Sequence, residues 1–226
     1  MSKLKKMMIC IMIIALTVTT LNMPVETQTK VQAATKKEKA LKSYLKELKS
    51  YCKALHGRLS SYKFALIDLN GDKIPEFLYS QDDGYHLSIC AYINGKAKKV
   101  GYGFSGGRVY YPNIHIYSTF TCHTGENSIT YYRFDGKKMI EVCSKYGHDE
   151  YNAITGKKKT YEEIVNAKDV YAPYLYKVNG KRTTKAKYNR VVKGIKKKGK
   201  KAKIVVHKAT KKNIRKYLDK NYLKGR

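Results

Sequence analysis

The sequence lacks most of the patterns that identify an enzyme or a metal protein. Its 226 residues include no tryptophan. They contain no Cys-x-x-Cys pair, so zinc or thioredoxin-like redox chemistry has no support, and no His-Glu-x-x-His, phosphate-loop or dinucleotide fingerprint. Two polar clusters remain, His148-Asp149-Glu150 and Cys122-His123. We expect the first to lie in a surface loop, and neighbours on a strand point to opposite faces, which disfavours the second. The sequence predicts no catalytic residues.

Long apolar runs are also missing, apart from one near the N-terminus. Lysines in the first six residues precede the uncharged segment Met7–Leu16, which is too short to span a bilayer. Val31-Gln32-Ala33 then places small residues as a signal peptidase requires, which predicts cleavage before Ala34. A retained anchor or a lipoprotein is disfavoured. We therefore expect residues 1–33 to be a signal peptide and the protein to be secreted, extracellular or attached to the cell wall.

Cysteine is sparse, and one of the five cysteines lies in the expected signal peptide. The other four are Cys52, Cys90, Cys122 and Cys143. In an exported protein they allow two disulfides, in any of three pairings. Four buried thiols acting as small apolar side chains are equally compatible with the sequence.

Acidic residues are scarce, and their scarcity is uneven. The chain carries 47 Lys and Arg against 17 Asp and Glu, but residues 61–176 carry 14 against 13 while residues 177–226 carry 21 against 1. A block of this kind attracts polyanions through long-range electrostatics and counterion release. We expect wall teichoic acid-like polymers or acidic glycans as partners, and peripheral contact with anionic membranes stays open. Lysine outnumbers arginine, which gives no support to a specific nucleic-acid partner.

The periodicity of the apolar residues predicts an α+β fold. Leucines and tyrosines recur every three or four positions over residues 36–55, which predicts a helix packed on the rest of the protein. Short β-branched and aromatic runs separated by Gly, Asn and Asp then predict an antiparallel β-sheet of hairpins. The expected strands are 62–68, 76–81, 86–93, 97–104, 114–121, 128–134, 138–145 and 171–178. The expected units are the N-terminal amphipathic helix (34–60), the antiparallel β domain (61–180) and a basic helical C-terminal region (181–226).

Three turns support the hairpins. Asn94-Gly95, Asp135-Gly136 and Asn179-Gly180 each lie between strand-like runs. These dipeptides favour two-residue type I′ turns, because both central residues need a positive φ.

The basic C-terminal region also carries apolar residues at helical spacing. Thr183 or Thr184 can cap a helix that presents Tyr188 and Ile195, and Thr210 can cap a last helix. Residues 204–207 can form a short strand. We expect this region to dock on the sheet domain with its lysines facing outward.

One loop carries oxygen ligands at regular spacing. The segment Phe64–Tyr79 contains a loop that begins at Asp68. Counted from there, positions 1, 3, 5 and 9 are Asp68, Asn70, Asp72 and Glu76. Alternate acidic and amide side chains converge their oxygens on one point, and calcium prefers six to eight oxygens. The backbone carbonyl of Ile74 adds another. The alternative is a tight turn in which these side chains bind backbone amides without a metal.

This segment resembles the calcium loops of FG-GAP and VCBS-type repeats, whose pattern is Asp-x-Asn/Asp-x-Asp-Gly-x-x-Asp/Glu between strands. It is also similar to the Asp-Ile/Leu-Asn-Gly-Asp-x-x-Pro-Glu segment of many uncharacterised exported proteins of Gram-positive bacteria. The resemblance implies that Asp68, Asn70, Asp72 and Glu76 donate side-chain oxygens to a structural calcium ion. Lys73 stands where the repeats usually have glycine.

Together these features predict a secreted, non-catalytic binding or cell-surface-associated protein. Its polycationic C-terminal region would hold anionic polymers of the envelope or of a host. Two alternatives stay open, namely a secreted enzyme with a dispersed active site and a cationic membrane-active or nucleic-acid-binding protein.

Overall fold

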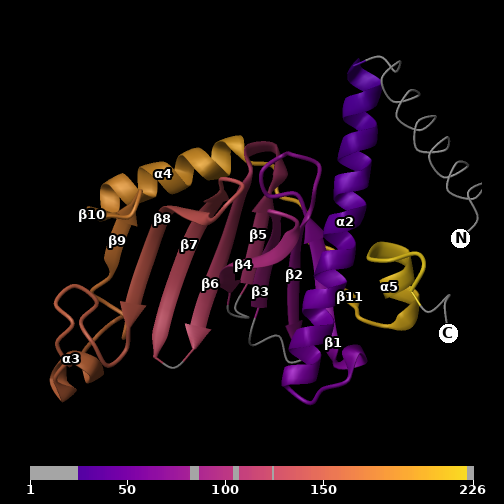
Figure 1. The fold of residues 1–226 in the computed structure, drawn as a ribbon. Coiled ribbons are helices and arrows are strands. Elements are labelled where there is room, and N and C mark those ends of the chain that lie inside the picture. The colour runs from indigo at the N-terminus through magenta and orange to yellow at the C-terminus, as the bar shows by residue number, and fades with distance from the viewer. Residues whose placement is uncertain (1–24, 82–86, 104–106, 124, 223–226) are drawn as a thin grey trace, which may run out of the picture.

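The computed structural model describes residues 25–81, 87–103, 107–123 and 125–222, and it has the predicted α+β class (Figure 1). The helices are α2 (Val25–Ala54), α3 (Tyr161–Val165), α4 (Lys185–Lys198) and α5 (Lys211–Tyr217), with short 3-10 turns at Leu59–Ser61 and Pro112–Ile114. The strands are β1 (Tyr62–Ile67), β2 (Glu76–Gln81), β3 (Leu87–Ile93), β4 (Lys96–Gly103), β5 (Gly107–Tyr111), β6 (Ile116–His123), β7 (Glu126–Phe134), β8 (Met139–His148), β9 (Leu175–Val178), β10 (Lys181–Thr183) and β11 (His207–Lys208).

The strands form two antiparallel sheets where the sequence predicted one. The first sheet has the order β11-β1-β2-β3-β4 and the second has the order β10-β9-β8-β7-β6-β5. Consecutive strands therefore pair throughout, except at the two places where the chain changes sheet, between β4 and β5 and between β10 and β11. Turn chemistry predicts which strands form hairpins, but it does not specify where one sheet ends and the next begins.

Helix α2 covers the outer face of the first sheet. Its buried residues Tyr44, Leu48 and Cys52 follow the predicted helical spacing, and the ring of Tyr44 stacks on that of Phe77 with centroids 5.2 Å apart. The helix begins at Val25, upstream of the expected start at residue 36, and it continues through the expected cleavage position at Ala33. The apolar core of the expected signal peptide, residues 7–16, lies outside the described residues.

A second apolar cluster joins the two sheets. It combines Ile67, Leu78 and Ile89 from the first sheet with Tyr117 and Phe134 from the second. Strands β1 to β3 are therefore buried on both faces, one against α2 and the other against the second sheet.

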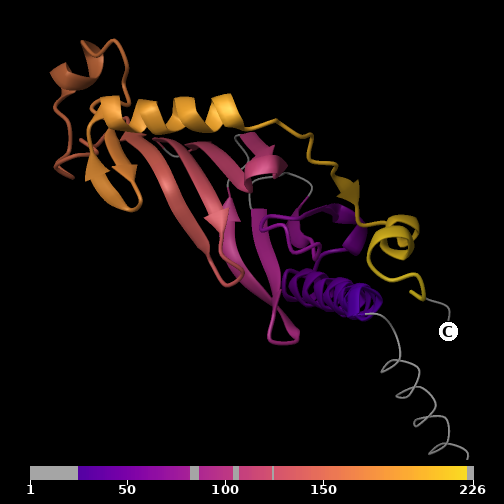
Figure 2. The ribbon, with the colours of Figure 1, turned by 90° about the horizontal axis from the view of Figure 1, so that it is seen from above.

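The C-terminal region ties these layers together. Tyr188 and Ile195 of α4 pack on the second sheet, and Ile214 and Leu218, in and just after α5, join the cluster between α2 and the first sheet. Figure 2 shows α4, residues 199–206, β11 and α5 following one another across the molecule. The predicted docking of the basic region is confirmed, and this region also contributes two strands to the sheets.

Two of the three predicted type I′ turns are confirmed. Asn94 and Gly95 have φ values of 52° and 78°, and Asn179 and Gly180 have φ values of 50° and 73°. The prediction for Asp135-Gly136 was wrong, because Phe134 pairs with Met139 and the loop has four residues. The carboxylate of Asp135 accepts the amides of Lys137 and Lys138, which closes this wider loop.

Other boundaries differ where local signals compete. No strand was expected between residues 104 and 114, yet Gly107–Tyr111 pairs with β6. Strand β9 begins at Leu175 rather than at residue 171. The backbone amide of Tyr171 donates a hydrogen bond to the carboxylate of Asp169, and Pro173 has no amide hydrogen to donate to a neighbouring strand. Helix α3 was not predicted.

Thr184 and Thr210 cap α4 and α5 as predicted, each accepting an amide three residues further on.

Three of the four cysteines are free and buried, namely Cys52, Cys90 and Cys143. Cys52 donates a hydrogen bond to the carbonyl of Gly57, with Sγ 2.7 Å from that oxygen. For these three residues the structure agrees with buried thiols, and the side chain of Cys122 lies outside the described residues.

Within the described ranges, no helix is long and apolar enough to cross a membrane.

Candidate functional site

The loop between β1 and β2 folds around its first aspartate. The carboxylate of Asp68 accepts the amide of Gly71 at 2.7 Å and the amide of Lys73 at 2.9 Å. Lys73 has a φ of 66°, which is a left-handed conformation that glycine adopts more readily than lysine. The Asp68 carboxylate helps to hold the lysine in a conformation that L-residues rarely adopt.

The next two side chains make similar local bonds. Asn70 Oδ1 lies 3.3 Å from the amide nitrogen of Asp72, and Asp72 Oδ1 accepts the amide of Ile74 at 2.8 Å. The side chain of Ile74 is buried in the cluster beneath α2, which fixes the end of the loop. These contacts correspond to the tight-turn alternative that the sequence left open.

Glu76 occupies the most unusual environment of the candidate ligands. Its side chain is only 2% exposed, and Oε2 accepts the amide of Leu69 at 2.7 Å. Burial raises the pKa of Glu76 to about 8, and the negative charges of Asp72 and Asp68 also raise it, while the hydrogen bond from Leu69 lowers it. A cation at the loop would favour the ionised carboxylate and draw this pKa down.

The second sheet fixes the position of the loop. The hydroxyl of Tyr110 donates a hydrogen bond to the carbonyl oxygen of Asp68. On the other side Gly71 has a φ of 81°, and a Cβ there would lie 2.7 Å from Cε1 of His115. Only glycine fits this close approach, so the loop is held between two residues of the second sheet and its flanking turn.

The predicted ligands are thus close in sequence but do not surround one point. Among the described residues, no group of three or more His, Cys, Asp or Glu side chains is arranged to hold a metal ion. Asp68, Asn70 and Asp72 direct oxygens to backbone amides of their own loop. The donor chemistry suits a hard cation, because carboxylates and carbonyls predominate, and binding would require some of these oxygens to reorient.

The second candidate is the basic C-terminal region, which we call the basic strap (residues 181–220). Every lysine and arginine in it is exposed, while apolar side chains such as Tyr188 and Ile214 are buried against the sheets and α2. Asp219 is its only acidic residue. The strap therefore presents cations outward along its whole length.

Residues 198–202, in the middle of the strap, are bonded to the second sheet and to the turn that follows β5. Asn113 donates from Nδ2 to the carbonyl of Lys198 at 2.8 Å and accepts the amide of Lys200 at 2.7 Å. Ala202 pairs with Tyr110, and Gly199 lies so close to Tyr111 that a Cβ would come within 2.4 Å of its ring. The run of lysines around Gly199 is therefore fixed in place rather than a loose tail.

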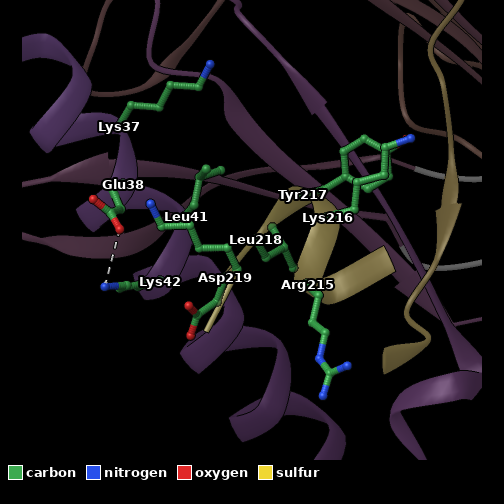
Figure 3. A pocket seen from close by; sticks show the side chains of 10 residues that line it. Lys37, Glu38, Leu41, Lys42, Arg215, Lys216, Tyr217, Leu218 and Asp219 are labelled. Atoms are coloured by element: carbon green, nitrogen blue, oxygen red, sulfur yellow. Dashed lines mark ion pairs between the residues drawn. The ribbon is translucent and has the colours of Figure 1, made fainter. Parts of the chain in front are cut away.

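A groove lies where the strap meets α2 (Figure 3). It has a volume of about 230 Å³, with Leu41 and Leu218 among its apolar lining. Its other lining residues are Lys37, Glu38, Lys42, Arg215, Lys216, Tyr217, Asp219 and Lys220. Five cations therefore stand against two carboxylates, and Glu38 lies 3.6 Å from the ammonium of Lys42. We call this the α2–α5 groove.

The sequence did not predict the groove. Residues 37–42 and 215–220 are far apart in the chain, and they meet because β11 pairs with β1 over only two residues, Lys208 with Lys63 and His207 with Phe64. A pairing this short has no sequence signature.

The tyrosines are mainly structural. In the pairs Tyr110-Tyr111 and Tyr131-Tyr132, three of the four side chains are buried, with at most 7% of each exposed. These three rings therefore belong to the interior of the sheets rather than to an exposed stacking surface.

Of the remaining polar clusters, His148 Nδ1 lies 3.2 Å from Asp149 Oδ1 at the end of β8. The backbone amide of Glu150 donates a hydrogen bond to the same ring nitrogen. The side chains of Cys122 and His123 lie outside the described residues.

Comparison of the chain with family models, with curated proteins and with solved structures finds no significant match.

Proposed function

We propose that this is an exported, non-catalytic, surface-associated protein that holds anionic polymers through the basic strap. The polymers in question are teichoic acid-like chains or acidic glycans of a cell envelope or of a host. The observation that carries the proposal is the strap itself, in which all cations from residue 181 to residue 220 are exposed on a segment fixed to the fold at both ends.

The shape of the strap suits a linear ligand. The 14 residues of α4 rise about 1.5 Å each, and the extended residues that follow rise about 3.3 Å each, so α4 and residues 199–206 together span roughly 45 Å. A polyanion lying along this length would contact many lysines at once and release its counterions. Because lysine is a point charge without the fork geometry of arginine, binding should depend on charge density more than on the structure of the repeat unit.

A pull-down on purified cell wall tests this proposal. Mature protein is mixed with intact wall and with wall stripped of its anionic polymers. We expect retention on the intact wall only. Equal recovery from both samples would contradict the electrostatic proposal and favour an enzyme acting on the wall, and leakage of dye from anionic vesicles would favour a membrane-active protein.

We also propose that the Asp68 loop binds calcium as a structural clip. The support is the environment of Glu76, whose ionisation is opposed first by burial and then by the charges of Asp72 and Asp68. A divalent cation would favour the ionised form. Extracellular calcium modules commonly bind with dissociation constants of about 0.1 to 1 mM.

Terbium offers a direct test, because it binds where calcium does and is sensitised by a nearby aromatic ring. The chain has no tryptophan, and the Tyr110 hydroxyl contacts the loop at Asp68. We expect tyrosine-excited terbium emission that calcium displaces, and calcium at about 1 mM should raise the melting temperature. Asp68→Ala should abolish both effects, while Tyr110→Phe should weaken the emission and keep the thermal shift. A wild-type melting curve unchanged by calcium would reject the site.

A further inference from the structure

Exposed apolar side chains are concentrated at one end of the molecule, in the segment between β8 and β9. Among the described residues nine large hydrophobic side chains are exposed, and five belong to this segment. They are Tyr151, Ile154, Tyr161, Val165 and Val170. This segment is therefore the place in the described chain to look for an interaction surface.

Helix α3 presents two of these side chains in a fixed orientation. Tyr161 is 80% exposed and Val165 is 59% exposed. They are four residues apart and therefore lie on one side of the helix. Thr160 and Glu163 form a capping box that fixes the first turn. We call α3 with its two exposed apolar residues the α3 tip.

A buried lysine holds this segment against the sheet. The ammonium of Lys159, which is 7% exposed, donates to the carbonyl of His148 at 2.6 Å and to that of Val170 at 2.5 Å. The α3 tip is therefore attached to the end of β8 at one side and to the segment before β9 at the other.

The same segment is nearly neutral in a strongly basic protein, with five acidic residues against four lysines (positions 157–159 and 168), and helix α3 itself carries two glutamates and no cation. Five of the chain's 17 acidic residues lie within it, namely Asp149, Glu150, Glu162, Glu163 and Asp169. Glu162 is exposed beside Tyr161. A complementary surface would combine apolar contact with a rim of cations.

The α2–α5 groove has these properties. The partly buried Leu41 and Tyr217 supply apolar contact, and Lys37, Lys42 and Lys216 are among the cations around it. Figures 1 and 2 place α3 and α5 at opposite ends of the molecule, so the α3 tip cannot reach the groove of its own chain.

We propose that the α3 tip of one molecule docks in the α2–α5 groove of a second copy. Tyr161 and Val165 would contact Leu41 and Tyr217, and Glu162 would face the lysines of the rim. The two surfaces differ, so the contact is head-to-tail and each copy keeps one free tip or groove for the next. Successive copies could line a polyanion, which would also neutralise the repulsion expected from a net charge of +30.

Sedimentation velocity over a concentration series tests the contact, at about 0.15 M salt so that long-range repulsion is screened beyond about 8 Å. We expect mass that increases with concentration and is not limited to a dimer. The tip variant is Tyr161→Ser with Val165→Ser, and the groove variant is Lys42→Glu with Lys216→Glu. Each should weaken self-association by about tenfold or more.

Mixing the two variants gives the decisive result. The intact tip of the groove variant fits the intact groove of the tip variant, so the mixture should form a one-to-one dimer that grows no further. The matched control is Val205→Ser with Val206→Ser, which removes two apolar side chains that are 57% and 49% exposed elsewhere on the strap and should leave association unchanged. A wild type that stays monomeric at every concentration would overturn the proposal. So would a tip variant that associates like the wild type, or a control variant that loses association equally.

Discussion

Raising the salt concentration from about 50 to about 200 mM should weaken binding to a phosphate-bearing polymer by roughly 10³-fold or more, if six to ten lysines contact phosphates. Binding measured by fluorescence anisotropy at several salt concentrations gives the slope of log K against log salt. Replacing Lys196, Lys197, Lys198, Lys200 and Lys201 by Gln should reduce that slope by about 0.7 to 0.9 per phosphate contact removed. All five are exposed, so the fold should be retained.

The matched control removes five exposed lysines away from the strap. Replacing Lys96, Lys98, Lys137, Lys138 and Lys157 by Gln changes the net charge equally. We expect this variant to keep nearly the wild-type slope, because the density of contacts on the strap would be intact. If both variants lowered the slope equally, net charge rather than the strap would determine binding.

Point substitutions are needed because the strap cannot be deleted. Tyr188, Ile195, Ile214 and Leu218 are at most 8% exposed, and they complete two of the three apolar clusters. A truncated chain would expose both clusters and would lose β10 and β11. Loss of binding after truncation would therefore report unfolding as much as loss of charge.

Local features of the fold could be predicted from the sequence. The caps at Thr184 and Thr210 and the turns at Asn94-Gly95 and Asn179-Gly180 depend on a few neighbouring residues. The spacing of Tyr44, Leu48 and Cys52 predicted the buried face of α2 for the same reason. The turn at Asp135 differed because its carboxylate accepts two amides and stabilises a longer loop than the dipeptide suggests.

The division into two sheets depends on contacts between residues distant in sequence. One signal was available, since the run Phe64-Ala65-Leu66-Ile67 and the strand Leu87–Ile93 are apolar on both faces. A strand with two apolar faces must be covered on both sides. One helix cannot provide both covers, so a second layer was implied even though its identity was not.

The candidate sites differ in the same way. The Asp68 loop is contiguous and could be located by spacing alone, but the buried state of Glu76 depends on packing against residues distant in sequence. The α2–α5 groove could not be predicted, because it exists only where residues 37–42 and 215–220 meet. The exposure of Tyr161 likewise requires the structure, since the tyrosines of this chain lie mainly in strands and clusters that bury them.

Glu76 should make the stability of the calcium-free protein depend on pH in an unusual direction. Its pKa is raised from 4.5 to about 8 in the folded state. The neutral side chain therefore favours folding fully below about pH 4.5, and this contribution is lost progressively as the pH rises towards 8. Each unit by which the folded-state pKa exceeds the unfolded-state pKa contributes roughly 1.4 kcal/mol to the free energy of unfolding. The stability lost between pH 4.5 and pH 8 is therefore on the order of a few kcal/mol.

Urea unfolding of the wild type and of Glu76→Gln, measured in a chelator from pH 4.5 to pH 9, isolates this effect. Glutamine retains an acceptor for the Leu69 amide and does not ionise, so the variant should become the more stable protein above about pH 6. Glu162→Gln, at an exposed site, should follow the wild type. Parallel curves for the wild type and Glu76→Gln would contradict the raised pKa. Calcium at pH 8 should restore the stability that the wild type has lost and should stabilise Glu76→Gln less, because that variant keeps Asp68 and Asp72 but lacks the charge of the Glu76 carboxylate.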